Sequence, residues 1–278
     1  MAGTLYLVGT PIGNLGDFSP RAIETLQSVD FIAAEDTRVT LKLLNRFGVK
    51  KPLVCYFEHT RAEMGEKLLS RLLAGESCAL VTDAGMPAIS DPGEDIVRQC
   101  AANGVSVLAV PGPSALVTAL ALSGLPTQRF TFEGFLAAAG KSRREHLESL
   151  KGERRTMIFY EAPHKLLRTL QDLLGAFGDR DVALCRELTK LHEEVIRTTL
   201  SEAVARYTET PPRGEFVLVL RGAPEETGPG LSEEAALALV ERYRAEGARL
   251  KDACRRAAAE SGHAANALYQ RALNAEKE

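Results

Sequence analysis

The stretch CALVTDAGMPAISDPG, residues 78–93, decides the fold. It joins a short apolar run to a long turn rich in glycine, proline and aspartate, and an amphipathic segment follows at 93–103. A buried strand that ends in a turn and continues into a helix is typical of a βαβ crossover in a parallel sheet. The stretch therefore predicts an α/β fold whose strands are covered on both faces.

The same alternation extends to both sides of this stretch. Further apolar runs alternate with amphipathic segments; they are TLYLV (4–8), FIAA (31–34), PLVCY (52–56) and VSVLAV (105–110). This spacing predicts a first α/β domain over residues 1–122 with a mainly parallel sheet.

A second series of apolar runs begins after the Gly-Pro segment at 124–128 and predicts another α/β domain over 123–222. Within it, EEVIRTTL (193–200) follows DVALC (181–185) too closely for a helical crossover, so this sheet is predicted to be mixed. The segment 223–230 is interpreted as a solvated linker.

The remaining residues, 231–278, predict a helix–turn–helix-like tail, with Gly247 and Gly262 as helix stop signals. Between Arg242 and Leu273 this tail carries seven Lys or Arg residues and three acids, a net charge of +4. A solvated charged face and a contact with nucleic acid both explain this excess, and the sequence leaves the choice open.

Composition excludes several classes of protein. With 34 Lys and Arg against 37 Asp and Glu, the chain cannot bind nucleic acid by overall charge, so any such surface must be local. The five cysteines are odd in number and form no CxxC pair, which argues against a zinc site or a disulfide scaffold, and no metal is expected. No transmembrane helix and no signal peptide are expected, and the predicted location is cytoplasmic.

Three Gly/Pro-rich turns, at 9–16, 82–93 and 110–115, follow strands of the first predicted sheet. Ligands of open parallel sheets bind outside the carboxyl ends of the strands, where such turns let the backbone approach them. The three turns together predict a pocket at this edge. The segment AEDTR (34–38) follows a strand at the same edge; either its charged groups serve the pocket, or Asp36 or Thr37 merely caps the next helix.

Taken together, these motifs resemble the tetrapyrrole-methylase superfamily of S-adenosylmethionine-dependent methyltransferases. The resemblance is carried in the family's order by nine segments: LVGTPIGNLGDFSPRA (7–22), AAEDTR (33–38), VTDAGMPAISDPG (81–93), VPGPSAL (110–116), GLPT (124–127), FTFEGFL (130–136), FYEAPHKL (159–166), RELTKLHEEVIR (186–197) and GEFVLVL (214–220). Within the superfamily, the chain is similar to enzymes that methylate the ribose 2′-hydroxyl of cytidine 1402 in 16S ribosomal RNA.

The resemblance implies S-adenosylmethionine as cofactor, the small ribosomal subunit as partner, a homodimer and a cofactor cleft between the two α/β domains. It assigns the cofactor to Asp83, Ala84, Gly85, Ile89, Ser90, Ser114, Ala115, Tyr160, Glu161, Ala162, Leu188 and Thr189. The candidates for catalysis are Glu35, Asp36, Arg38, Glu187 and Lys190. Those for RNA binding are Thr10, Asn14, Arg38, Lys165, Arg249, Lys251, Arg255 and Arg256. The alternative is a superfamily member that methylates a tetrapyrrole macrocycle. A broad apolar acceptor pocket without basic residues would favour this alternative.

Overall fold

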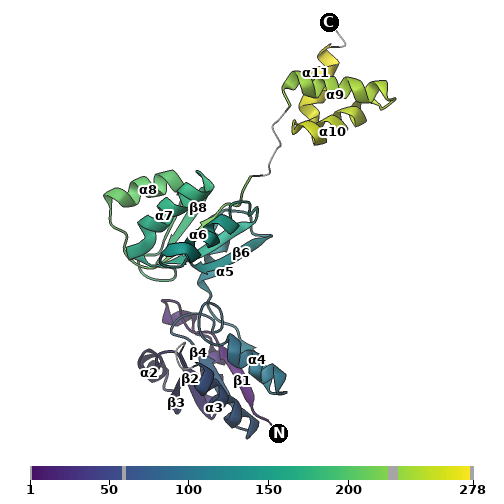
Figure 1. Cartoon of the computed structure of the whole chain (residues 1–278). Coiled ribbons are helices and arrows are strands. Elements are labelled where there is room, and N and C mark those ends of the chain that lie inside the picture. The colour runs from purple at the N-terminus through teal and green to yellow at the C-terminus, as the bar shows by residue number, and fades with distance from the viewer. Residues whose placement is uncertain (1, 58–60, 225–230, 276–278) are drawn as a thin grey trace. The chain divides into compact units, whose positions relative to one another are not determined.

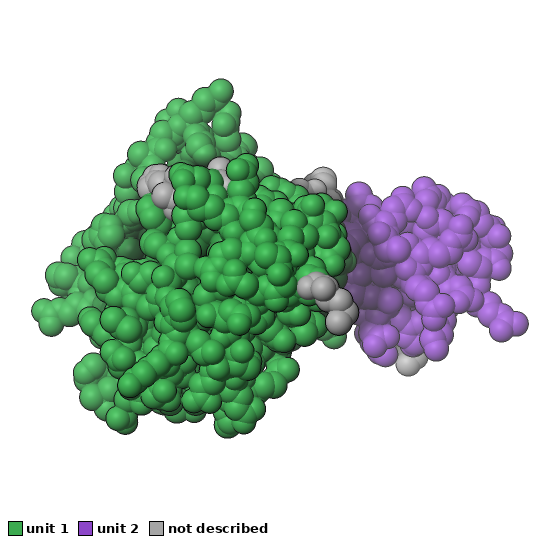
Figure 2. Space-filling model, turned by 90° about the horizontal axis from the view of Figure 1, so that it is seen from below, with its two compact units in different colours: residues 1–223 green, residues 224–278 purple. Residues whose placement is uncertain are grey.

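A computed structural model describes residues 2–57, 61–224 and 231–275 of the chain (Figure 1). They form two compact units, Met1–Ala223 and Pro224–Glu278, which are coloured separately in Figure 2. Most of the predicted linker, residues 225–230, lies outside the described residues. Among the described helices, none is long and apolar enough to cross a membrane.

The first sheet of unit 1 has five parallel strands in the order β3-β2-β4-β1-β5. The strands are β1 (Thr4–Val8), β2 (Phe31–Ala34), β3 (Leu53–Cys55), β4 (Cys78–Val81) and β5 (Ser106–Val110). All residues of β2 and β4 are buried, as the unbroken apolar runs predict for strands covered on both faces. The predicted parallel sheet is therefore confirmed.

Helices cover both faces of this sheet because successive strand residues point to opposite sides. On one face, Ile32 and Val81 pack with residues of α1 (Pro20–Ser28) and α2 (Thr37–Arg46). On the other face, Phe31 and Leu80 pack with residues of α3 (Arg61–Leu73) and α4 (Glu94–Ala102). A short 3-10 helix, η1 (Leu15–Asp17), lies in the turn after β1. Because the five strands are parallel, all the loops that leave their carboxyl ends emerge at one edge of the sheet.

The second sheet is mixed, as predicted, with the order β6-β7-β10-β8-β9. Only β6 and β7 pair in parallel, and the other three pairs are antiparallel. Its strands are β6 (Phe130–Phe135), β7 (Thr156–Glu161), β8 (Asp181–Arg186), β9 (Glu194–Thr199) and β10 (Phe216–Leu220). The last strand, β10, inserts between β7 and β8, so that Phe216 lies beside both Glu161 and Arg186.

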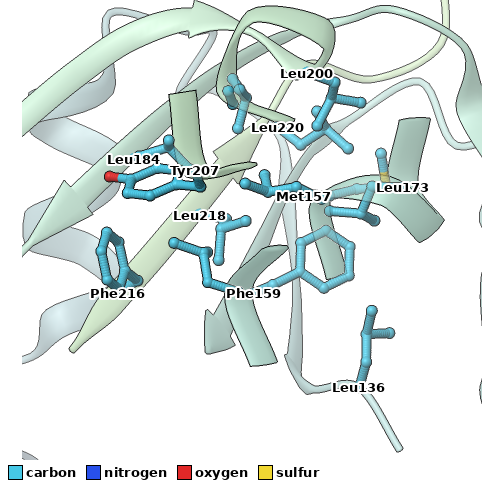
Figure 3. Packing of buried hydrophobic residues seen from close by; sticks show 14 of the residues in the cluster. Leu136, Met157, Phe159, Leu173, Leu184, Leu200, Tyr207, Phe216, Leu218 and Leu220 are labelled. Carbon is cyan, nitrogen blue, oxygen red and sulfur yellow. The ribbon is translucent and has the colours of Figure 1, made fainter. Parts of the chain in front are cut away.

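Three helices cover one face of the second sheet: α6 (Gly140–Ser149), α7 (Pro163–Phe177) and α8 (Leu200–Glu209). Figure 3 shows Met157, Phe159 and Leu218 of the strands packed with Leu200 and Tyr207 of α8. The sequence analysis did not predict α8. Its signal is the capping-box sequence pattern, a threonine at 199 and a glutamate three residues later; in the structure the Thr199 hydroxyl accepts from the Glu202 amide.

The opposite face of the second sheet is covered by α5 (Ala115–Ser123). Leu116, Ala119 and Leu120 of this helix pack with Ile158 and Val217 of the strands. The helix directly follows β5 of the first sheet yet packs on the second. Residues 111–123 therefore carry the chain from one sheet to the other.

Unit 2 contains the helices of the predicted tail: α9 (Glu233–Ala245), α10 (Leu250–Ser261) and α11 (Ala265–Ala275). They share an apolar core formed by small, aliphatic and aromatic side chains, among them Val240, Tyr243, Ala257 and Leu268. Gly262 ends α10 in a left-handed conformation, which confirms it as a stop signal.

Candidate functional site

A cavity of about 440 Å³ lies within unit 1 and is lined by residues of both sheets. The first sheet contributes Ile12, Glu35 and the turn after β4, with Ser114 and Ala115 following from the start of α5. The second sheet contributes Phe135, Tyr160–Pro163, Cys185, Leu188, Lys190 and Glu215–Val217. Cavities of this size hold cofactors and other small molecules. The pocket that the three Gly/Pro turns predict is therefore present at the carboxyl edge of the first sheet.

Backbone contacts hold the three turns together. The backbone of Thr10 pairs with that of Gly85 through two hydrogen bonds of 2.9 and 3.1 Å. Gly9 lies so close to Gly112 that a Cβ on Gly9 would stand 2.7 Å from the Gly112 Cα. Because such a contact leaves no room for any side chain, glycine is required at this crossing of the first and third turns.

Strained backbone is concentrated in the loops around the cavity. Four non-glycine residues of the described chain have positive φ angles: Ala88, Ser90, Glu187 and Thr189. Two lie in the turn after β4 and two in the loop after β8. Such conformations are costly and persist where the surrounding structure over-determines them, commonly at functional sites.

The carboxylate of Glu35 is held at the cavity wall by the turn after β4. Its Oε2 accepts hydrogen bonds from the Thr82 hydroxyl at 2.6 Å and from the Asp83 amide at 3.4 Å. No hydrogen bond to its Oε1 is found within the described chain. Glu35 is thus positioned through one oxygen, and the other is available for a ligand.

Asp91 shares the Thr82 hydroxyl with Glu35 and also lines the cavity. Burial, together with the nearby charge of Glu35, raises the pKa of Asp91 to about 6. The geometry agrees with a raised pKa for Asp91. The hydroxyl of Thr82 has a single hydrogen and donates it to Glu35, so it cannot also donate to Asp91. Sequence analysis did not select Asp91, although it lies in the turn that predicts the pocket.

Asp36 and Arg38 lie beside the cavity and do not line it. The Asp36 carboxylate caps α2 by accepting from the Arg38 amide at 2.8 Å, so of the two predicted capping residues Asp36 is the one that caps the helix. It also binds the Arg38 guanidinium at 2.6 Å, and the hydrogen bonds from Arg38 lower the pKa of Asp36 to about 2. The Asp36 amide donates to Asp83 at 3.2 Å, so this pair supports a residue of the cavity wall.

Lys190 joins the loop after β8 to the start of β10. Its amine lies 3.0 Å from a Glu187 oxygen and 2.8 Å from a Glu215 oxygen. Burial alone would lower the pKa of Lys190, but the hydrogen bonds to Glu215 and Glu187 outweigh this effect and raise it. Lys190 therefore remains a cation at the cavity and cannot act as a neutral base.

The first turn packs directly on this lysine. A Cβ on Gly13 would stand 2.4 Å from the Lys190 Cγ. The two sheets therefore meet at the cavity through this contact of Gly13 with Lys190.

On the second sheet, Tyr160 and Glu161 end β7 at the cavity. The Tyr160 hydroxyl accepts a hydrogen bond of 3.1 Å from the Leu116 amide in the first turn of α5. Burial raises the pKa of Tyr160, so the phenol stays neutral at physiological pH. The buried Glu161 accepts from the Ala162 amide at 2.9 Å and from the Thr169 hydroxyl at 2.5 Å.

The structure brings most of the predicted site residues together. All the predicted cofactor residues except Thr189 line the cavity, and so do Glu35 and Lys190 of the catalytic candidates. Glu187 contacts Lys190 without lining the cavity. The cavity residues that sequence analysis did not select are Ile12, Thr82, Met86, Asp91, Phe135, Pro163, Cys185, Glu215, Phe216 and Val217.

The candidates for RNA binding are dispersed. Thr10 is buried and donates to the Thr82 carbonyl at 3.0 Å, whereas Asn14 is exposed and caps η1. Lys165 is half-buried in the first turn of α7. Arg38 is exposed beside the cavity. The remaining four candidates are exposed on unit 2: Arg249, Lys251, Arg255 and Arg256.

Comparison with known proteins decides the family. The family model for tetrapyrrole (corrin/porphyrin) methylases matches residues 4–204. The chain belongs to this family. It is 49% identical to the ribosomal RNA small subunit methyltransferase I of Synechocystis sp. over 99% of both chains. It is also 47% identical to the protein of that name from Bacillus subtilis, over 92% of this chain and 89% of the relative.

This methyltransferase also shares its fold with solved structures of lower identity. Diphthine synthase aligns over 79% of this chain and 90% of its own, with a TM-score of 0.62 and 16% identity. Uroporphyrin-III-C-methyltransferase from Thermus thermophilus aligns over 78% and 94%, with a TM-score of 0.54 and 21% identity. These likenesses confirm the fold class that the sequence predicts.

The carboxyl of Asp91 provides a direct test of the cavity's electrostatics. We expect its ¹³C resonance to titrate near pH 6, and Glu35→Gln to lower this midpoint because a negative neighbour is removed. The sign for stability follows: the ionised form is disfavoured in the folded state, so stability falls as pH rises from about 4 to about 6. A midpoint near pH 4 in the wild type, unchanged by Glu35→Gln, would contradict the arrangement.

Proposed function

We propose that this methyltransferase uses S-adenosylmethionine to methylate the 2′-hydroxyl of a cytidine ribose in 16S ribosomal RNA of the small subunit. The observation that best supports the proposal is the cavity. Within a methylase fold, the carboxylate of Glu35 and the ammonium group of Lys190 both line it. Relatives that match nearly the whole chain and are named ribosomal RNA methyltransferases support the substrate class.

The residues of the cavity suit S-adenosylmethionine. Backbone groups of Asp83–Gly85 and of Ala115 and Ala162 offer fixed, uncharged partners for its polar ends. The rings of Phe135 and Tyr160 meet edge to face, with centroids 5.6 Å apart, and aromatic rings attract a sulfonium charge. When bound, this cofactor supplies an electrophilic methyl group.

Glu35 is our candidate for the proton acceptor. A ribose hydroxyl loses its proton as it is methylated, and a positioned carboxylate can accept that proton. Of the carboxylates at the cavity, Glu35 is fixed through one oxygen by Thr82 and keeps the other available. Asp36 and Arg38 act through Asp83 as positioning residues, and Glu187 does so through Lys190.

Cations around the cavity are the candidates for binding the RNA acceptor. Lys190, held between two carboxylates, offers a point charge to a phosphate or a ribose oxygen. Arg38 and Lys165 are further phosphate candidates, and Arg38 is highly exposed despite its ion pair with Asp36. The relatives that match nearly the whole chain and are named ribosomal RNA methyltransferases favour RNA over a tetrapyrrole acceptor.

The proposal predicts methyl transfer to isolated ribosomal subunits. Wild-type protein with tritiated S-adenosylmethionine should label undermethylated 30S particles, and nuclease mapping should place the label on one cytidine ribose. Label on a base would contradict the 2′-O assignment. Binding of the cofactor without label on 30S particles or naked 16S RNA would favour the tetrapyrrole alternative.

The matched variant for this assay is Glu35→Gln. It keeps an oxygen for the Thr82 hydroxyl but cannot take a proton, so we expect the transfer rate to fall by about 100-fold or more. Cofactor affinity should change little, which isothermal titration would measure. A variant with the wild-type rate would remove Glu35 from the acceptor role.

We also propose that unit 2 docks on RNA. Its exposed residues Arg249, Lys251 and Arg255 lie on or beside α10, and no ion pair is found for them in the described part of the tail. Arg256 differs, because its guanidinium lies over the Tyr243 ring and near Glu246. The homodimer and the cytoplasmic location that the sequence analysis expects stay predictions.

Charge reversal at Arg249, Lys251 and Arg255 in the full chain tests the docking of unit 2. We expect the KM for 30S particles to rise roughly tenfold or more, because phosphate contacts dominate such affinity. The conservative double variant Arg249→Lys/Arg255→Lys keeps the charge and should behave like the wild type. An unchanged KM in the reversal variant would show that the tail's charge is only a solvated face.

A further inference from the structure

The exposed face of α2, the helix that begins two residues after Glu35 of the cavity, carries a row of cations. Arg38, Lys42 and Arg46 are spaced four residues apart and all are exposed, so they lie on one face of the helix. We name these three residues the α2 stripe. From Thr37 to Phe57 the chain holds five Lys or Arg residues and no Asp or Glu, in a protein whose net charge is −3.

Most of this charge has no acidic partner among the described residues. Arg38 binds Asp36, but no ion pair is found for Lys42 or Arg46 within the described residues. Arg46 in the last turn also complements the helix dipole, which is a structural role. Lys42, in the middle of the helix, has no such role. Exposed Val39 and Leu41 lie on the same helix, 40% and 49% accessible.

The helix connects this charge to the cavity. Glu35 lines the cavity, and α2 begins two residues later, with the Asp36 amide bonded to Asp83 of the cavity wall. Because β2 and β3 are parallel, α2 runs back along the sheet, away from the cavity edge. Its ten residues extend ~15 Å, with a cation every ~6 Å.

We propose that the α2 stripe is a second RNA-binding surface, which holds the phosphates of the strand that flanks the target nucleotide. The inference rests on the proposed function, since it takes RNA as the acceptor in the cavity. Evenly spaced cations, of which Lys42 and Arg46 are unpaired, suit a phosphate backbone, and the exposed apolar side chains of Val39 and Leu41 beside them suit its bases and sugars. The stripe belongs to unit 1 and is separate from the cations of the tail.

The test is the double variant Lys42→Glu/Arg46→Glu in the full chain. The matched control is Arg129→Glu/Arg154→Glu, which makes the same charge change at two exposed arginines before β6 and β7, at the opposite end of those strands from Tyr160. The probe is a fluorescein-labelled single-stranded RNA with the 16S sequence around the target cytidine. Affinity is measured at several salt concentrations, and KM and kcat are measured on 30S particles.

We expect the stripe variant to bind this RNA roughly tenfold or more weakly and to lose about 1.4 from the slope of log affinity against log salt, because two phosphate contacts are removed. Its KM should rise while kcat, thermal unfolding and cofactor affinity stay near those of the wild type. The control variant should match the wild type throughout.

Two results would overturn the inference while the proposed function stands. In the first, wild-type protein methylates 30S particles and both double variants bind RNA equally well. In the second, the stripe variant binds naked RNA normally but loses affinity for 30S particles, which would assign the stripe to an acidic protein surface. If wild-type protein transfers no methyl group to RNA, the proposed function itself fails, and this inference fails with it.

Discussion

The backbone contact between Gly9 and Gly112 is the constraint on which the cavity depends. The two residues follow β1 and β5, neighbouring strands of the first sheet, and their backbones approach more closely than any side chain would allow. The Thr10–Gly85 pair then fixes the turn after β4 to the same point. Three turns far apart in the sequence thereby form one rigid wall. A wall made of backbone is suited to a ligand that must be held in a fixed orientation, because its donors and acceptors cost no reorganisation on binding.

The second sheet completes the site through contacts that cross between the sheets. Gly13 packs on Lys190, and the Tyr160 hydroxyl accepts from the first turn of α5. That helix follows the first sheet in sequence but packs on the second. Charged groups are then distributed around one volume: Glu35 and Asp91 on one side, Lys190 between its two carboxylates on the other. Such an arrangement can hold a positively charged cofactor and an anionic strand at once, and the α2 stripe, which follows Glu35 in the chain, would add cations outside the cavity on the Glu35 side.

Much of this was predictable from sequence because both sheets are encoded by short apolar runs, and the turns after them by glycine and proline. The cofactor candidates came from the family resemblance, and all but Thr189 line the cavity. Other residues were not predictable for topological reasons. Phe216 and Val217 reach the cavity only because β10 inserts between β7 and β8, which no local pattern reveals. Asp91 has an ordinary place in a turn, and its raised pKa arises from burial beside Glu35, which depends on the folded packing. The helix α8 was missed although its capping box is visible in the sequence.

The central claim is that the meeting of the turns creates the cofactor site, and titration calorimetry with S-adenosylmethionine tests it most directly. The variant is Gly112→Ala, whose Cβ would stand 2.8 Å from the Gly9 Cα, and the matched control is Gly175→Ala, where a Cβ in α7 meets nothing within 4 Å. We predict that wild-type protein and the control bind the cofactor with equal affinity, and that Gly112→Ala binds it roughly tenfold or more weakly, because misplacement of a rigid site is costly. Equal affinity in all three proteins, with Gly112→Ala folded, would contradict the account.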